Sequence, residues 1–244
     1  MKITSIFFIL VSLILFSCNG LNNKSVYSQK SESGLNGSVK KVTKYICPVK
    51  NDKIPTDTTH YTARIITTYD RVGNLLTENN FYNLEPRITE YITTYSGKGK
   101  NRSYVQKSIR GNLVADGSYK YVWLDDYYFT VVPSDTGNTS GFVIESRLDK
   151  DFRIIKSIYK MRDTIRLTDE FEYVIKNNKV QETIHKRMVN EGNNKRIINQ
   201  VIVPQEFDQQ GNPTLIYIYS RPDKQNLQNV TLMIYEYYDD PKNK

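Results

Sequence analysis

The sequence is nearly without alanine, which occurs only at Ala63 and Ala115 among 244 residues. Alanine is the strongest helix former, so its scarcity argues against a bundle of helices. Tyrosine, in contrast, occurs 19 times, together with many isoleucines, valines and threonines, and these residue types suit the surface of a β-sheet. The composition therefore excludes a helical bundle and predicts an all-β protein.

Long apolar runs are also scarce. The one clear run, Ile3 to Phe16, follows the charged Lys2 and is too short to span a bilayer as a helix. We therefore predict a signal peptide over residues 1–17. The run ends in Leu15-Phe16-Ser17-Cys18, which resembles the lipobox of bacterial lipoproteins. This resemblance implies lipidation of Cys18, and an ordinary signal peptide with an incidental cysteine is the alternative.

The residues after the lipobox indicate a location. Asn19 stands where an aspartate would retain a bacterial lipoprotein in the inner membrane, which favours the outer membrane. No acidic residue precedes Glu32, so the acidic cluster that exports some lipoproteins to the cell surface is missing. More than one acyl chain on Cys18 would make a stable anchor. We expect an outer-membrane lipoprotein of the cell envelope that faces the periplasm.

Cysteine is as rare as histidine, with two of each. Once Cys18 is acylated, Cys47 has no partner, so the fold cannot depend on an internal disulfide. We expect Cys47 to be a small buried side chain. Residues 18–38 are rich in Gly, Ser and Asn and are interpreted as the acylated N-terminus and a flexible tether. A single all-β domain is predicted for residues 39–244.

Turn signals recur about 13 residues apart, as at Arg71-Val72-Gly73-Asn74 and Ser96-Gly97-Lys98-Gly99. This spacing suits a strand of ~9 or 10 residues and a short loop. It predicts an antiparallel meander of about 12–14 strands. A sheet this wide should form a strongly curved sheet, a half-barrel or barrel, or a two-layer sandwich.

Alternating polarity identifies the buried faces of some strands. Ile165, Leu167, Phe171, Tyr173 and Ile175 share one parity with Asp169, while the charged residues of that segment take the other. In residues 230–237 one face is aliphatic and the other is rich in tyrosine. A membrane-spanning β-barrel is disfavoured, because charges such as Glu182 and Lys186 interrupt any continuous apolar band.

Two segments share the pattern aromatic-Asp-x-x-Gly-Asn. They are Tyr69-Asp70-Arg71-Val72-Gly73-Asn74 and Phe207-Asp208-Gln209-Gln210-Gly211-Asn212. The pattern resembles the YD repeat of Rhs-type proteins and of many bacterial lipoproteins, and the resemblance implies β-hairpins, with glycan binding in some relatives. Physically, the Asp can bond the backbone of a turn while the Gly takes a positive φ. We interpret the motif residues as structural.

Few residues of the sequence are candidates for a catalytic role. His60 and His185 fall in what we interpret as separate strands, outside any metal or nucleophile motif, and are expected on a sheet surface. We therefore expect no metal and no cofactor. Asp135-Thr136-Gly137 matches the aspartic-protease triplet, but it lacks the second copy that such chemistry requires and is interpreted as a loop.

The chain is basic, with a formal net charge of +8. Basic residues gather in one segment without an intervening acid. This candidate partner surface consists of Lys98, Lys100, Arg102, Tyr104, Lys107 and Arg110. Because export makes nucleic acid an unexpected partner, an anionic lipid, a glycan or an envelope protein is favoured, and a solvated hairpin edge is the alternative.

The sequence as a whole predicts a lipid-anchored, non-catalytic envelope module that binds or scaffolds a partner protein, glycan or lipid. An envelope glycan hydrolase is the alternative. It would use carboxylates such as Asp125, Asp126, Glu170 and Glu172, two of which would have to lie close together in a cleft.

Overall fold

The computed structural model describes residues 27–51, 53–84, 87–135, 141–177, 179–192, 194–220 and 223–239. The predicted signal peptide, Cys18 and the first part of the predicted tether lie outside these residues. The elements are α2 (Gln29–Glu32), β1 (Val39–Pro48), β2 (Ala63–Tyr69), β3 (Leu75–Leu84), β4 (Arg87–Lys98), β5 (Asn101–Arg110), β6 (Leu113–Trp123), β7 (Tyr128–Pro133), β8 (Phe142–Leu148), β9 (Ile154–Met161), β10 (Thr164–Lys176), β11 (Lys179–Glu191), β12 (Asn194–Phe207), β13 (Pro213–Tyr219) and β14 (Leu227–Tyr237).

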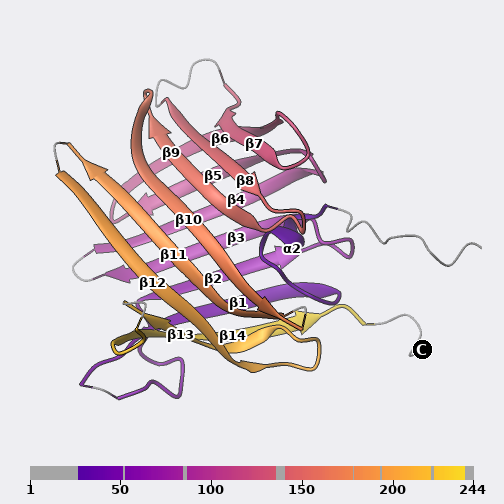
Figure 1. Cartoon of the computed structure of the whole chain (residues 1–244). Coiled ribbons are helices and arrows are strands. Elements are labelled where there is room, and N and C mark those ends of the chain that lie inside the picture. The colour runs from indigo at the N-terminus through magenta and orange to yellow at the C-terminus, as the bar shows by residue number, and fades with distance from the viewer. Residues whose placement is uncertain are drawn as a thin grey trace, which may run out of the picture.

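The strands form a closed barrel. Each strand pairs antiparallel with the next one in the chain, which confirms the predicted meander. The first and last strands also pair, with Tyr45 opposite Leu232, so the sheet has no free edge. The structure thus selects the barrel over the half-barrel and sandwich. In Figure 1 the wall formed by β8–β12 crosses in front of the wall formed by β2–β6.

Successive side chains point alternately into the lumen and outward. On β10 the predicted buried face, which includes Asp169 and Tyr173, points inward, and Glu170 points outward to Lys156. On β14 the tyrosine face points inward. The aliphatic face points outward, where Ile234 is 54% exposed.

One half of the lumen is filled by aromatic side chains. Tyr104, Phe129, Val131 and Leu148 are buried there, and further aromatic residues pack around them. Tyr104 stacks on Tyr119 with ring centroids 5.0 Å apart. This side of the barrel is therefore a packed core. Cys47 lies elsewhere, on β1, and is free and completely buried, as predicted.

The outer wall carries ion pairs between neighbouring strands. Lys156 on β9 bonds Glu170 on β10 at 2.8 Å, and Lys41 on β1 bonds Glu236 on β14 at 2.8 Å. Lys160 and Glu145 form another such pair between β9 and β8. Charged side chains of the outer surface therefore lie within strands as well as at their ends.

The two aromatic-Asp-x-x-Gly-Asn segments are turns at the same end of the barrel. Asp70 accepts hydrogen bonds from the backbone amides of Val72 and Asn74, and Gly73 has a φ of +88°. The Asp208 turn repeats this pattern, with a φ of +82° at Gly211. The Asp149 turn between β8 and β9 has the same pair of bonds, to the amides of Asp151 and Arg153, although its sequence does not match the motif.

Residues 27–38 pack across that end of the barrel, and we call them the plug. The prediction of a flexible tether up to Ser38 therefore does not hold for this part. The reason is that polar side chains bind the plug backbone. The Asn212 side chain accepts from the Asn36 amide at 2.7 Å and donates to the Asn36 carbonyl at 3.0 Å. Gln29, on α2, is buried and bonds the backbone at Leu75 and Gly99.

We predict that Asn212→Ala destabilises the protein by about 2 kcal/mol, because Asn212 is fully buried and its bonds to Asn36 would be lost. Denaturant unfolding measures this change. Hydrogen exchange should also rise within residues 28–37. Asn112→Ala, at an exposed turn of the opposite end, is the matched control and should change neither quantity.

Candidate functional site

The predicted catalytic carboxylates do not converge. Asp125 and Asp126 lie in the turn between β6 and β7, where Asp125 accepts from the Tyr127 amide. Glu170 and Glu172 lie on β10, and Glu170 is paired with Lys156 on the outer wall. None of these four carboxylates lines the lumen cavity described below, so the structure gives the hydrolase alternative no support. Asp135 follows β7 in a connecting segment, and its Thr136-Gly137 neighbours lie outside the described residues.

The predicted basic surface is divided. Arg102 and Tyr104 point into the lumen and are buried, so they cannot contact a partner at the outer surface. Lys98 lies at the plug end of the barrel, whereas Arg110 lies at the opposite end of the β4–β5 hairpin. Strand alternation separates these residues, since neighbours in sequence face opposite sides of the sheet. Lys107 remains exposed on the outer wall.

The histidines also differ from expectation. His60 lies in the connection between β1 and β2 and not in a strand. His185 points into the lumen, stacks on Phe171 and is buried, so the expected sheet-surface position is wrong for it. One ring nitrogen of His185 bonds Asp169 at 2.8 Å, and the other bonds Gln200 at 3.2 Å. Both ring nitrogens of His185 are therefore hydrogen-bonded inside the lumen.

Asp169 is the centre of this lumen cluster. Its two carboxylate oxygens also accept from the Arg187 guanidinium at 2.7 and 3.0 Å. Burial alone would raise the pKa of Asp169, but the hydrogen bonds from His185 and Arg187 outweigh it, so the pKa lies below its ordinary value. The cluster satisfies its own charges and does not line the main cavity.

That cavity occupies the plug half of the lumen and measures about 1040 Å³. Residues of β1–β3 on one wall and of β10–β14 on the other contribute to it, and plug residues 31–36 close part of its end. Its size lies at the upper end of the range of about 300–1,000 Å³ that is typical of small-molecule sites. The cavity is therefore the best candidate for a functional site.

The two walls differ chemically. On β1–β3 the lining includes the polar side chains of Lys44, Glu78 and Asn80 beside the apolar Val42 and Ile65. On β12–β14 it is apolar and includes Ile202, Ile216 and Met233. A molecule with one polar and one apolar part would match both walls at once.

Lys44 and Glu78 are the charged residues of the polar wall. Desolvation lowers the pKa of Lys44, while the charge of Glu78 acts in the opposite direction. The Glu78 carboxylate accepts a hydrogen bond from the side-chain amide of Asn80 at 2.7 Å. Opposite them, Tyr173 donates to the Ile154 carbonyl at 2.7 Å, and burial raises its pKa to about 12, so this phenol stays protonated at neutral pH.

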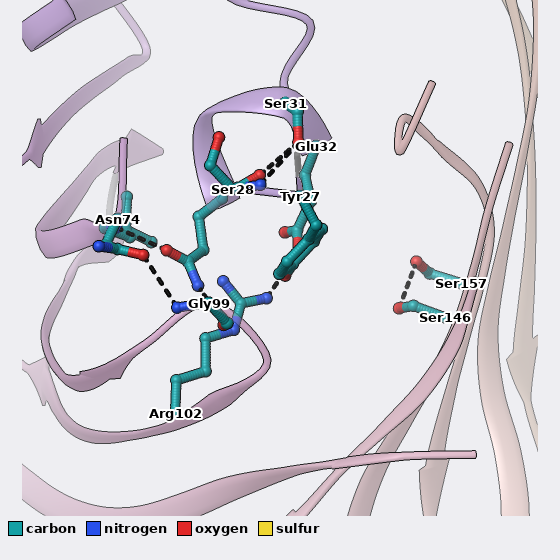
Figure 2. A network of polar contacts seen from close by, with 11 residues as sticks. Tyr27, Ser28, Ser31, Glu32, Asn74, Gly99, Arg102, Ser146 and Ser157 are labelled. Atoms are coloured by element: carbon teal, nitrogen blue, oxygen red, sulfur yellow. Dashed lines mark hydrogen bonds and ion pairs between the residues drawn. The ribbon is translucent and has the colours of Figure 1, made fainter. Parts of the chain in front are cut away.

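The plug is fixed above the lumen by a buried ion pair. Arg102 bonds Glu32 at 2.6 Å with its side chain only 3% exposed, and Tyr27 also donates to Glu32. The guanidinium lies 3.7 Å from the centroid of the Tyr121 ring. Figure 2 shows Arg102 extending from its strand toward Glu32 and Tyr27, with Asn74 and Gly99 beside the helical turn. These contacts attach the plug to β3, β5 and β6.

The cavity reaches the surface beside the plug. Ile175 and Phe207 line it and are 45% and 38% exposed, and Lys179 lies over the Phe207 ring at 5.5 Å. Asp151 and Arg153 complete this rim and are paired with each other at 2.8 Å. No pattern in the sequence predicted this cavity. The signal that could have indicated the cavity is the presence of the polar residues Lys44, Glu78 and Asn80 within segments predicted as strands.

Among the described residues, no cluster of His, Cys, Asp and Glu side chains has the form of a metal site. None of the described helices has the length and apolar character needed to cross a bilayer.

Comparisons with known proteins add little. No protein-family model matches the chain, and no curated protein matches it. Among solved structures, a porin-like protein from Bacteroides uniformis ATCC 8492 is similar to it at 10% identity, with 83% of this chain and 99% of that chain covered and a TM-score of 0.27. A likeness at this score supports no functional argument.

We predict that the Asp169 cluster makes the fold sensitive to acid. A carboxylate whose pKa is depressed by folding contributes stability above its unfolded pKa of about 3.9, and this contribution is lost as the pH falls through the lower folded value. Asp169→Asn should therefore lower stability at neutral pH and flatten its decline below about pH 4. Urea unfolding between pH 2 and pH 7 tests this. Asp116→Asn, which is exposed on the outer wall, should retain the wild-type profile.

Proposed function

We propose that the protein is a lipid-anchored, non-catalytic binding module of the cell envelope, and that its lumen holds a small amphipathic molecule. The observation that carries this proposal is the cavity of about 1040 Å³ with one polar and one apolar wall inside a closed barrel. Apolar burial supplies affinity in such a site, and a few polar groups fix orientation.

The charged residues of the outer wall favour a barrel that is surrounded by water and not by lipid. A transmembrane barrel presents a continuous apolar band to the lipid, about 25 Å tall. Here the pairs Lys156–Glu170 and Lys41–Glu236 lie in neighbouring strands of the outer wall. On β4–β6, Lys107 lies opposite both Ile92 and Asp116, where it separates exposed apolar residues. We therefore favour attachment through Cys18 over insertion of the barrel.

The anchor would orient the cavity toward the membrane. Tyr27 begins the described plug, and nine residue steps separate it from Cys18, which can span at most about 30 Å. The rim at Ile175 and Phe207 lies at the same end of the barrel as the plug. Lipidation of Cys18 in the outer membrane would thus hold the cavity opening close to the lipid surface. A lipid or another membrane amphiphile is accordingly favoured over a soluble glycan or a partner protein.

We predict that Met233→Trp weakens binding of an apolar fluorescent probe, N-phenyl-1-naphthylamine, at least about tenfold, because the larger indole would occupy the cavity that Met233 lines. Fluorescence titration measures the change. Ile234→Trp, the neighbouring residue on the outward face of β14, should leave probe affinity unchanged.

Equal affinity of wild type and Met233→Trp for the probe would show that binding occurs outside the lumen. Circular dichroism and thermal unfolding of both tryptophan variants serve as the folding control. Absence of probe binding to the wild-type protein would count against a lumen ligand of this class. A scaffolding role would then be favoured over ligand binding.

We predict further that Cys18→Ala abolishes membrane association. The substitution removes the thiol that would be acylated, and more than one acyl chain is needed for stable attachment. Metabolic labelling with a fatty acid and fractionation of the envelope measure the outcome. Cys47→Ala, which alters the other cysteine, should keep both label and membrane location. Unchanged labelling of Cys18→Ala would contradict the anchor.

A further inference from the structure

We infer that the lumen ligand carries an acidic head group and that the Lys44 ammonium binds it. The inference rests on the proposed function and specifies its ligand class as an anionic amphiphile, such as a fatty acid or another lipid with a negatively charged head. It depends on where Lys44 lies and on what surrounds it.

The pairing of β1 places the Lys44 side chain inside the barrel. Lys44 lies opposite Met233 on β14 and opposite Ile65 on β2, and both of these residues line the cavity with it. Lys41, three residues earlier and of opposite parity, points outward to Glu236. Strand alternation thus places the Lys44 side chain in the lumen and the Lys41 side chain on the outer surface.

Glu32 and Arg153, which also line the cavity, already have charged partners, and the Lys179 ammonium at the exposed rim lies over the Phe207 ring. Glu32 is bound by Arg102 and Tyr27, and Arg153 is bound by Asp149 and Asp151. Within the described part of the chain, the Lys44 side chain makes neither an ion pair nor a hydrogen bond. The negative charge of Glu78 acts on Lys44, but Glu78 bonds the Asn80 side chain and forms no ion pair with the lysine.

An unpaired ammonium is costly in a lumen of low polarity, and an anionic ligand would offset that cost. The apolar part of the same ligand has a place to lie. Met233 lies beside Lys44 on the paired strand β14, Ile216 and Ile202 follow on β13 and β12, and Ile175 and Phe207 continue the apolar lining to the rim. A ligand whose anionic head binds Lys44 would therefore place its hydrocarbon chain along these apolar residues, toward the opening of the cavity.

The acidic Glu78 should set a limit on the head group. Its carboxylate would repel a second negative charge close to Lys44. A singly charged carboxylate or phosphodiester is therefore preferred over a phosphomonoester of higher charge.

The test compares dodecanoate, dodecanol and dodecyltrimethylammonium, which share one chain and differ in head charge. Isothermal titration with the full chain should rank them in that order. Lys44→Met should weaken dodecanoate binding about tenfold or more, because a charged hydrogen bond is lost, and should change dodecanol affinity less than about twofold. Lys44→Arg should retain most of the dodecanoate affinity. Lys41→Met, on the outer face, is the matched control and should bind dodecanoate like the wild type.

The outcomes separate the two proposals. Binding of all three amphiphiles with equal affinity, or equal loss of dodecanoate and dodecanol in Lys44→Met, would overturn the role of Lys44 and leave the lumen site intact. If none of the three binds, the proposed function itself fails. Stronger binding of dodecanoate to Glu78→Gln than to the wild type would support the inference independently, and weaker binding would contradict it.

Discussion

Pairing between the first and last strands is the interaction on which the rest of this structure depends. β1 joins β14 antiparallel from Val39 to Pro48, with one shift of register between Val39 and Lys41, and this closure turns a long meander into a barrel. Every strand then has two neighbours, so backbone hydrogen bonds are satisfied without an edge. Closure also creates the lumen of the barrel. Residues far apart in sequence, such as Lys44 and Tyr173, face the same space only because the ring is complete.

The interior combines packing on one side with open volume on the other. Aromatic side chains from β5–β9 fill their half of the lumen, whereas the half between β1–β3 and β10–β14 retains a cavity. Charges inside are handled in two ways. The Asp169 cluster and the Arg102–Glu32 pair satisfy themselves, while Lys44 remains without a partner among the described residues. This difference distinguishes a group that supports the fold from a group that can receive a ligand.

The plug connects the fold to the proposed anchor. Its backbone is bound by Asn212. Its helical turn bonds the backbone of Leu75 and Gly99 through Gln29, and Arg102 through Glu32. The aromatic-Asp-x-x-Gly-Asn turns therefore do more than reverse the chain. The terminal Asn of one copy holds Asn36, and the terminal Asn of the other accepts from the Gly99 amide. One motif thus shapes the hairpins and also secures the segment that crosses their ends.

Much of the architecture was readable from the residues themselves. The scarcity of alanine, the spacing of turns and the alternation along β10 predict an antiparallel meander of about this many strands, because strand pairing and side-chain alternation are local properties. Local patterns could not place Arg102, Tyr104 and His185 inside a lumen, since the same alternation is compatible with several curved forms of the sheet. Nor could they show that residues 27–38 pack onto the barrel, because the partners of the plug are Leu75, Gly99 and Asn212, which are remote in sequence. Only closure of the ring decided which face of each strand became the interior, and with it the existence of a cavity and the position of Lys44.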